Sequence, residues 1–203
     1  KSLPNADLWI FICQKDHSIK YKFKELLDSK FKKNYILLEL NGLTQGQAST
    51  CFEASKYLNL DDKINIGSCD STIYYDKLYA KKMLTKSDIL IYAFKDQEFS
   101  NKNPYSYGWI KPLNKYLVNE ISCKEPISNN PKKDMGIVGN FSFTKASIFI
   151  EGYKRLKKND IKVNNEFYLD VLVADCLKNN VKTSYIEVKD YYSWGTPEEM
   201  LHY

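Results

Sequence analysis

The chain has 203 residues, of which 43% are hydrophobic and 14% aromatic, so it can bury a sizeable core and is not disordered as a whole. Thirty basic and 25 acidic side chains give a net charge of +5, but the lysines are scattered and mixed with acidic residues, which argues against a nucleic-acid partner. No apolar run reaches the length of a membrane span or has the form of a signal peptide.

Short apolar runs alternate with helical patterns in the first half of the chain. Strands are predicted at residues 8–13, 35–38, 64–66 and 89–94, and helices at 19–29, 46–58 and 74–84. Runs that are apolar on both faces are typical of parallel strands covered by helices. This alternation predicts an α/β fold with three αβα layers around a mixed, mostly parallel sheet.

After Phe94 the pattern changes to paired strands and longer helices. Residues 107–110 and 118–123 predict two paired strands, and 136–143 predict a strand interrupted by glycine. Thr144 is expected to cap the next helix, and another helix carries residues 167–177. A strand at 183–188 and a helix opened by Thr196 and Pro197 complete the chain.

Two segments of small residues lie where ligands bind in open α/β sheets. Asp70 follows the strand at 64–66 among small neighbours, where a carboxylate can hold a divalent metal against a phosphate; a turn aspartate is the alternative. Residues 42–50 predict a loop that opens into a helix capped by Thr44 or Gln45. Together they describe a crevice beyond the carboxyl ends of strands.

The five cysteines, at positions 13, 51, 69, 123 and 176, show no C-x-x-C spacing. They predict neither a zinc site nor a disulfide framework, and they favour a reducing cytoplasm as the location. Cys69 is interpreted as a small buried residue and not as a nucleophile. His17 and His202 have no partners at triad-like spacing.

The order of several motifs resembles that of the nucleotidyltransferases that make sugar nucleotides and related activated metabolites on a glycosyltransferase-A-like fold. The motifs are Thr44–Ala48, Gly67–Ser71, Asn103–Gly108, Lys124–Pro126, Gly139–Asn140, Asn165–Asp170 and Trp194–Pro197. The resemblance runs from Leu8 to Tyr203. The Asn-Pro-x-x-Tyr-Gly-Trp run and the Trp-Gly-Thr-Pro ending are similar to a capsule and surface-polysaccharide branch that includes a phosphoglutamine cytidylyltransferase.

The resemblance implies a Mg²⁺-dependent transfer between a nucleoside triphosphate (CTP, UTP or dTTP) and a small phosphorylated acceptor, with release of pyrophosphate. It implies a single domain over residues 1–203, with a nucleotide-binding half at 1–95 and an acceptor-binding half at 96–203; a homo-oligomer is compatible with it. Asp70 is the implied catalytic residue and metal ligand. The implied nucleotide-binding residues are Thr44, Gln45, Gly46, Gln47 and Cys69. The implied acceptor-binding residues are Tyr107, Gly108, Lys124, Gly139, Asn140 and Glu166.

Three departures from the family's pattern stand out. Its glycine-rich phosphate loop and the Arg and Lys that follow precede the point where this sequence begins, so the phosphate-loop strand is not expected here. The second metal aspartate is replaced by Ser193, and Asp190 is the nearby candidate, with a surface carboxylate as the alternative. Lys124 is shifted by one residue, which in a strand would turn its side chain to the other face.

The sequence does not decide the roles of two acidic residues, and it allows two alternative functions. Glu166 is either an acceptor ligand or a first-turn glutamate favoured by the helix dipole, and Asp170 is expected to face solvent. A glycosyltransferase that consumes a nucleotide sugar is the first alternative function, although Ser68 occupies the partner position of an Asp-x-Asp motif. A non-catalytic nucleotide-binding module is the second.

Overall fold

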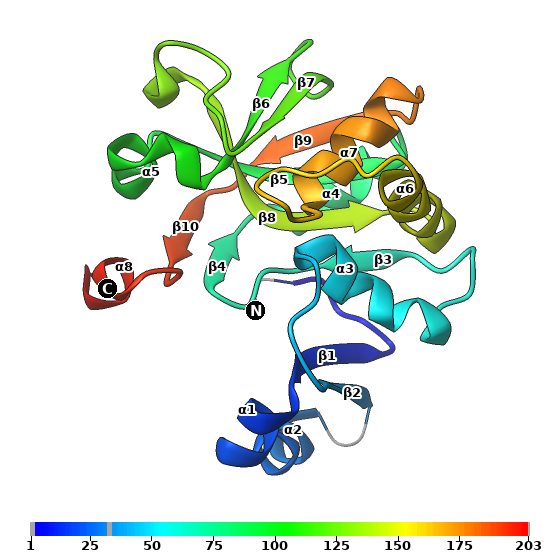
Figure 1. Ribbon diagram of the computed structural model, residues 1–203. Helices are drawn as coiled ribbons and strands as arrows, with labels where there is room; N and C mark the ends of the chain where they lie inside the picture. Colours follow the sequence, from blue (N-terminus) through cyan, green and yellow to red (C-terminus); the bar gives the residue numbers. More distant parts are fainter. Residues whose placement is uncertain (1–2, 32–33, 203) are drawn as a thin grey trace.

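The computed structural model describes residues 3–31 and 34–202 (Figure 1). In chain order, its strands and α-helices are β1 (Trp9–Gln14), α1 (Lys15–Lys20), α2 (Phe23–Phe31), β2 (Tyr35–Leu40), α3 (Gln47–Phe52), β3 (Ile64–Ile66), β4 (Ser71–Tyr74), α4 (Lys77–Met83), β5 (Ile89–Lys95), α5 (Glu98–Lys102), β6 (Gly108–Pro112), β7 (Val118–Cys123), β8 (Met135–Phe143), α6 (Ala146–Lys158), α7 (Leu169–Lys178), β9 (Thr183–Glu187), β10 (Asp190–Ser193) and α8 (Pro197–His202). None of the helices in these residues is long and apolar enough to cross a membrane.

The strands form one large sheet and two small ones. The large sheet has the order β7-β6-β8-β5-β9, and β3 pairs with β8 off this path. Within this sheet the expectation of mostly parallel strands was wrong: β8 runs antiparallel to β3, β5 and β6, and among the described residues of the sheet only β5 and β9 pair in parallel. The predicted α/β fold and the predicted pairing of β6 with β7 are confirmed.

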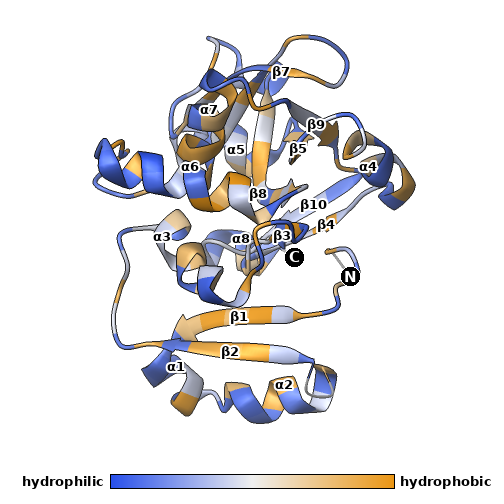
Figure 2. Cartoon of the chain, turned by 90° about the vertical axis from the view of Figure 1, so that its right-hand side faces the viewer, coloured by the Kyte–Doolittle hydropathy of each residue, from blue (hydrophilic) through white to orange (hydrophobic). Residues whose placement is uncertain are grey.

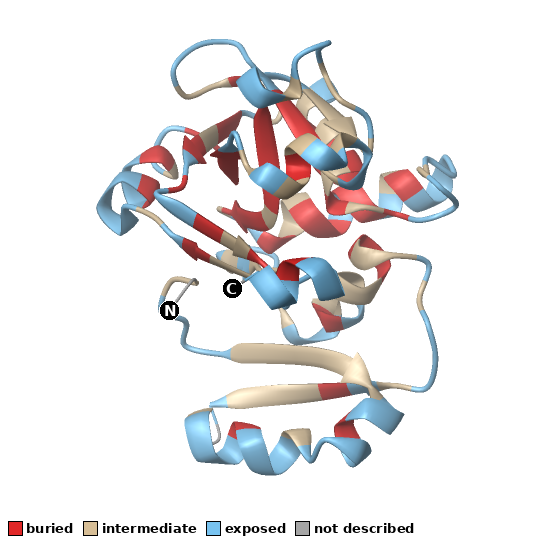
Figure 3. Cartoon of the chain, turned by 90° about the vertical axis from the view of Figure 1, so that its left-hand side faces the viewer, coloured by how far each residue is buried: buried red, intermediate tan, exposed pale blue. Residues whose placement is uncertain are grey.

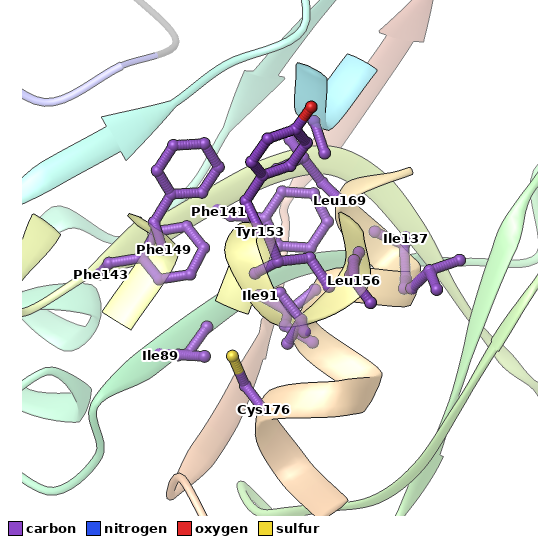
Figure 4. Close-up of a cluster of buried hydrophobic side chains, with 14 of the residues drawn as sticks. Ile89, Ile91, Ile137, Phe141, Phe143, Phe149, Tyr153, Leu156, Leu169 and Cys176 are labelled. Atoms are coloured by element: carbon purple, nitrogen blue, oxygen red, sulfur yellow. The ribbon is translucent and has the colours of Figure 1, made fainter. Parts of the chain in front are cut away.

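Both faces of the large sheet are covered, which gives the expected three layers. Along β5, Ile89, Ile91 and Ala93 point into a cluster shared with α3, α6 and α7 (Figure 4). The alternate residues, Leu90, Tyr92 and Phe94, belong to a second cluster with α4, β4 and β10. Successive side chains of a strand point to opposite faces, so the unbroken apolar run of β5 supplies both cores.

A smaller unit contains β1 and β2, which pair in parallel below the main body (Figure 1). Its helices α1 and α2 lie against the far side of this two-stranded sheet (Figure 2). Both strands are strongly apolar (Figure 2), yet every residue of β1 is only half-buried (Figure 3). The sequence places β1 inside a sheet, whereas the structure pairs it along one edge.

Several element boundaries differ from the predictions for physical reasons. The helix predicted from residue 74 begins only at Lys77, because Tyr74 is the last residue of β4, which pairs with β10 from the end of the chain. The predicted helix 46–58 is divided into α3 and a 3₁₀ segment at Glu53–Tyr57. Lys145 and not Thr144 occupies the N-cap of α6, and Thr144 instead donates its backbone N–H to Asp88.

Candidate active site

Asp70 lies at the end of the β4–β10 ribbon, beside the Trp-Gly-Thr-Pro motif. The ribbon register places Ser71 opposite Ser193, and the Trp194 N–H donates to the Asp70 carbonyl oxygen at 2.7 Å. A Cβ on Gly195 would lie 3.2 Å from Asp70 Oδ2. Two segments from opposite halves of the chain therefore hold this carboxylate.

The segment before Asp70 contacts the glycine-containing bulge of β8. Ser68 donates its hydroxyl to Asp70 Oδ1. Gly139 has φ +94°, and a Cβ there would lie 3.4 Å from the Ser68 Cβ. The next residue, Asn140, is only 3% exposed, and within the described residues its Oδ1 atom has no hydrogen-bond partner. Gly139 thus lies beside the segment that precedes Asp70, whereas Asn140 is buried in the fold.

Asp190 does not lie beside Asp70 in the structure. It pairs with Tyr74, at the opposite end of the ribbon from Ser71. The second carboxylate near Asp70 is Glu199, which the sequence analysis did not single out; its Oε2 atom would lie 3.4 Å from a Cβ on Gly195. Across residues 3–31 and 34–202, no group of three or more His, Cys, Asp or Glu side chains has an arrangement suited to a metal ion.

Glu199 links this end of the site to Tyr107. The Tyr107 hydroxyl donates to Glu199 Oε1 at 2.8 Å. The Thr196 N–H donates to Glu199 Oε2 at 2.9 Å, and the Glu199 N–H donates to Thr196 Oγ1 at 3.2 Å. These reciprocal bonds form a capping box at the start of α8, which confirms the predicted role of Thr196 and Pro197. The Thr-x-x-Glu spacing, which the sequence analysis did not use, is the local signal that marks this carboxylate.

Asp170 faces the backbone of Gly108 and not open solvent. A Cβ on Gly108 would collide with the Asp170 carboxylate, so this position requires glycine. Burial raises the pKa of Asp170 to about 6, although the nearby Lys124 charge and a hydrogen bond with Cys123 act in the opposite direction. The expected solvent-facing position was therefore wrong.

Lys124 reaches the same cluster despite its shifted place in the sequence. It follows the last residue of β7 and has φ +59°, so the alternation of a strand no longer sets its direction. Its ammonium group donates to the Ser106 carbonyl oxygen and lies 5.3 Å from the centre of the Tyr168 ring. Burial, followed by a hydrogen bond to Glu166, raises the pKa of Tyr168 to about 12. The expectation that Lys124 turns away was wrong.

Glu166 stands beside the small-residue loop that was predicted to bind the nucleotide. Gly46 has φ +104°, and a Cβ there would lie 2.9 Å from the Glu166 Cβ. The Phe167 N–H donates to the Gln45 carbonyl oxygen at 2.8 Å, so backbone pairing holds the two segments together. Because α7 begins at Leu169, Glu166 is not in its first turn, and the helix-dipole interpretation was wrong.

The loop itself is closed by threonine side chains and not by a helix cap. Gly46 is the N-cap of α3, which begins at Gln47, and no side chain caps that helix. Thr44 Oγ1 instead donates to the Gly46 carbonyl oxygen at 3.0 Å and lies 2.6 Å from Thr50 Oγ1. The expected cap from Thr44 or Gln45 was therefore wrong, although the loop conformation depends on Thr44.

A cavity of about 300 Å³ lies between this loop and the small β1–β2 unit. Its lining residues are Ile12, Cys13, Gln14, Leu40, Gly42, Leu43, Thr44, Gly46, Thr50 and Glu166. The carboxyl ends of β1 and β2 therefore border it, which is the edge where α/β sheets bind ligands. Cys69 is not among the lining residues; it is exposed, and partial desolvation, followed by the Asp70 charge, raises its thiol pKa.

The site residues form one continuous series of neighbours. Gly46 meets Glu166, which helps to raise the pKa of Tyr168, and the Lys124 ammonium group lies over the Tyr168 ring. The Lys124 N–H donates to the Tyr107 carbonyl oxygen at 3.0 Å, and the Tyr107 hydroxyl reaches Glu199 beside Asp70. Segments predicted separately to bind a nucleotide, an acceptor and a metal are therefore linked through neighbouring residues.

Comparison with known proteins shows which solved structures have a similar fold. No protein-family model and no curated protein matches the chain. A nucleoside-diphosphate-sugar pyrophosphorylase from Vibrio cholerae RC9 has a similar structure, with a TM-score of 0.75 and 19% identity over 95% of this chain and 78% of that one. For the inositol-1-phosphate CTP transferase from T. maritima the TM-score is 0.68 and the identity 11%, over 96% of this chain and 72% of that one. For HddC from Yersinia pseudotuberculosis the TM-score is 0.64 and the identity 15%, over 98% of this chain and 77% of that one. The chain therefore has the fold of nucleotidyltransferases.

Proposed function

We propose that this protein is a magnesium-dependent nucleotidyltransferase that couples a nucleoside triphosphate to a small phosphorylated acceptor in surface-polysaccharide or capsule biosynthesis. In this reaction a phosphate oxygen of the acceptor attacks the α-phosphorus of the nucleotide, and the bond to pyrophosphate breaks. The observation that carries the proposal is the continuous series from Gly46 to Asp70, which spans the positions that a nucleotide, an acceptor and a cation would need.

The nucleotide is assigned to the cavity at the Thr44–Gln47 loop. Gly46 brings bare backbone to the cavity wall, and the Thr44 and Thr50 hydroxyl groups fix the loop. A preformed loop loses little conformational freedom on binding, which favours affinity. We place nucleobase contacts here, in the half formed by residues 1–95, and we propose the cytoplasm as the location because nucleoside triphosphates are made there.

The acceptor is assigned to the half formed by residues 96–203, around Tyr107, Gly108 and Lys124. The Lys124 ammonium group supplies positive charge for a phosphate, and Glu166 is exposed and can accept hydrogen bonds from hydroxyl groups. Transfer of a phosphoryl-type group depends mainly on positioning and on neutralisation of charge, and these side chains can provide both.

Asp70 fits a hard divalent cation because its Oδ2 atom faces the space left by the missing side chain of Gly195. Mg²⁺ is typically held by one or two carboxylates together with substrate phosphates, so a large cluster of protein ligands is not required. A cation bound there supplies charge neutralisation to the phosphates. Asp190 cannot share a cation with Asp70, since the ribbon register separates the two.

The proposal is tested by pyrophosphate release from the protein with CTP, UTP or dTTP, Mg²⁺ and a series of sugar phosphates and related acceptors. We expect release with at least one pair, and a fall of about 100-fold or more in the Asp70→Asn variant, the scale seen when a group that stabilises transition-state charge is removed. No release with any pair by correctly folded protein would refute the proposal. Hydrolysis of a nucleotide sugar without pyrophosphate would favour a glycosyltransferase.

A further inference from the structure

Glu199 is a buried carboxylate that has no basic partner among residues 3–31 and 34–202. Its residue is only 4% exposed, and among the described residues no Lys, Arg or His nitrogen lies within 4.0 Å of its oxygen atoms. The neighbouring Glu198 differs in both respects, because its side chain is 73% exposed and lies 3.5 Å from Lys102. A buried carboxylate is costly unless an opposite charge or a metal compensates it.

The capping box does not account for this charge. Glu199 accepts hydrogen bonds from Tyr107 and from the Thr196 backbone, and these fix the position of both oxygen atoms. A neutral Gln at the same position of a capping box makes the same backbone contact. The role in helix capping therefore explains a polar side chain here but leaves the negative charge unexplained.

The charge faces a space shared with Asp70. A Cβ on Gly195 would lie 3.2 Å from Asp70 Oδ2, 3.4 Å from Glu199 Oε2 and 3.8 Å from Ser193 Oγ. Three oxygen atoms from three different segments thus lie within 3.8 Å of one point that a side chain at position 195 would crowd. Oxygen ligands from one or two carboxylates are the donor set that Mg²⁺ and Mn²⁺ accept beside phosphates.

We propose that Glu199 is the second carboxylate of the cation site, acting with Asp70 across Gly195. This inference rests on the proposed function and extends it by assigning the negative charge that the sequence pattern lacks at Ser193. Gly195 leaves the cation its space, and Tyr107 orients Glu199 toward it. The site thus obtains its second carboxylate from the first turn of α8 and not from β10.

The test is Mn²⁺ binding to the full chain, followed by electron paramagnetic resonance with and without CTP, UTP or dTTP. Glu199→Gln keeps the capping contact and removes the charge, so we expect Mn²⁺ affinity to fall about tenfold or more, at least as far as when an outer-shell partner of a metal ligand is lost. Glu198→Gln is the matched control and should stay within about twofold of the wild type, because surface charges contribute little. Unchanged thermal unfolding of Glu199→Gln would show that the capping role is preserved.

A second variant keeps the proposal falsifiable if Glu199→Gln does not fold. Gly195→Ala leaves every charge in place and fills the shared space, so it should also weaken Mn²⁺ binding. Wild-type affinity in either variant, or no Mn²⁺ binding by the wild type, would overturn the assignment of Glu199. Mn²⁺ binding that depends on Glu199 without pyrophosphate release would instead refute the proposed reaction and leave the cation site standing.

Discussion

Among substitutions that add one methyl group to the loop at residues 42–50, Gly46→Ala should lower the free energy of unfolding the most. Gly46 has φ +104° and ψ 178°, a combination that is essentially confined to glycine and costs about 1–3 kcal/mol for another residue. The added Cβ would also lie 2.8 Å from the Phe167 backbone nitrogen and 2.9 Å from its carbonyl oxygen. Overpacking of this kind costs about 1–3 kcal/mol. Together these terms predict a loss of about 2–6 kcal/mol in the free energy of unfolding.

Gly42→Ala is the matched control from the same loop, because a Cβ there meets no atom within 4 Å. Its effect should lie within about 0.5 kcal/mol of zero, as for most surface substitutions. Urea denaturation followed by far-UV circular dichroism and by tryptophan fluorescence measures both variants, with the slope m compared to confirm that the denatured state is unchanged. Equal midpoints for the two variants would refute the claim that Gly46 is held against Phe167.

Two further substitutions test the packing around Asp170 and β8. Burial raises the pKa of Asp170 to about 6, so the folded state binds this proton more tightly than the unfolded chain does, and stability is lost as the pH rises from about 4 through 6. Asp170→Asn should therefore raise the free energy of unfolding at pH 7 by about 1–3 kcal/mol and change it little at pH 4, and equal effects at both values would contradict this. Gly136→Ala places a Cβ into the ring of Phe94, which is stacked on Tyr191 at 4.9 Å and cannot withdraw. It should cost about 1–3 kcal/mol, seen as a lower melting temperature; an unchanged one would show that the ring can move.

The features that the sequence predicted correctly depend on local chemistry. The unbroken apolar run of β5 predicted a strand buried on both faces, and Thr196 with Pro197 predicted the start of α8. In each case a few adjacent residues determine the conformation, so no knowledge of distant segments was needed.

The features that the sequence pattern did not predict depend on residues far apart in the chain. Strand β4 was not predicted, and its last residue was assigned to a helix, because the partner strand β10 lies near the other end of the sequence. Asp170 was expected to face solvent because nothing local shows that Gly108 packs against it. Glu199 is a conventional capping residue until the ribbon brings Asp70 to the opposite side of Gly195. Such contacts are set by sheet pairing, which a single sequence does not specify.

The β4–β10 ribbon also determines when the site can form. Asp70 leaves the ribosome well before Trp194, whose N–H holds its carbonyl oxygen, and contacts between such distant residues form late because loop closure costs entropy. The large sheet can therefore be complete in a folding intermediate that has no functional site. Cleavage of the chain after β9 would leave the cluster around α6 and α7 intact, remove Val188 and Tyr191 from the second cluster, and take Trp194, Gly195 and Glu199 away from Asp70. Catalytic activity would thus report the completion of folding more strictly than secondary structure does.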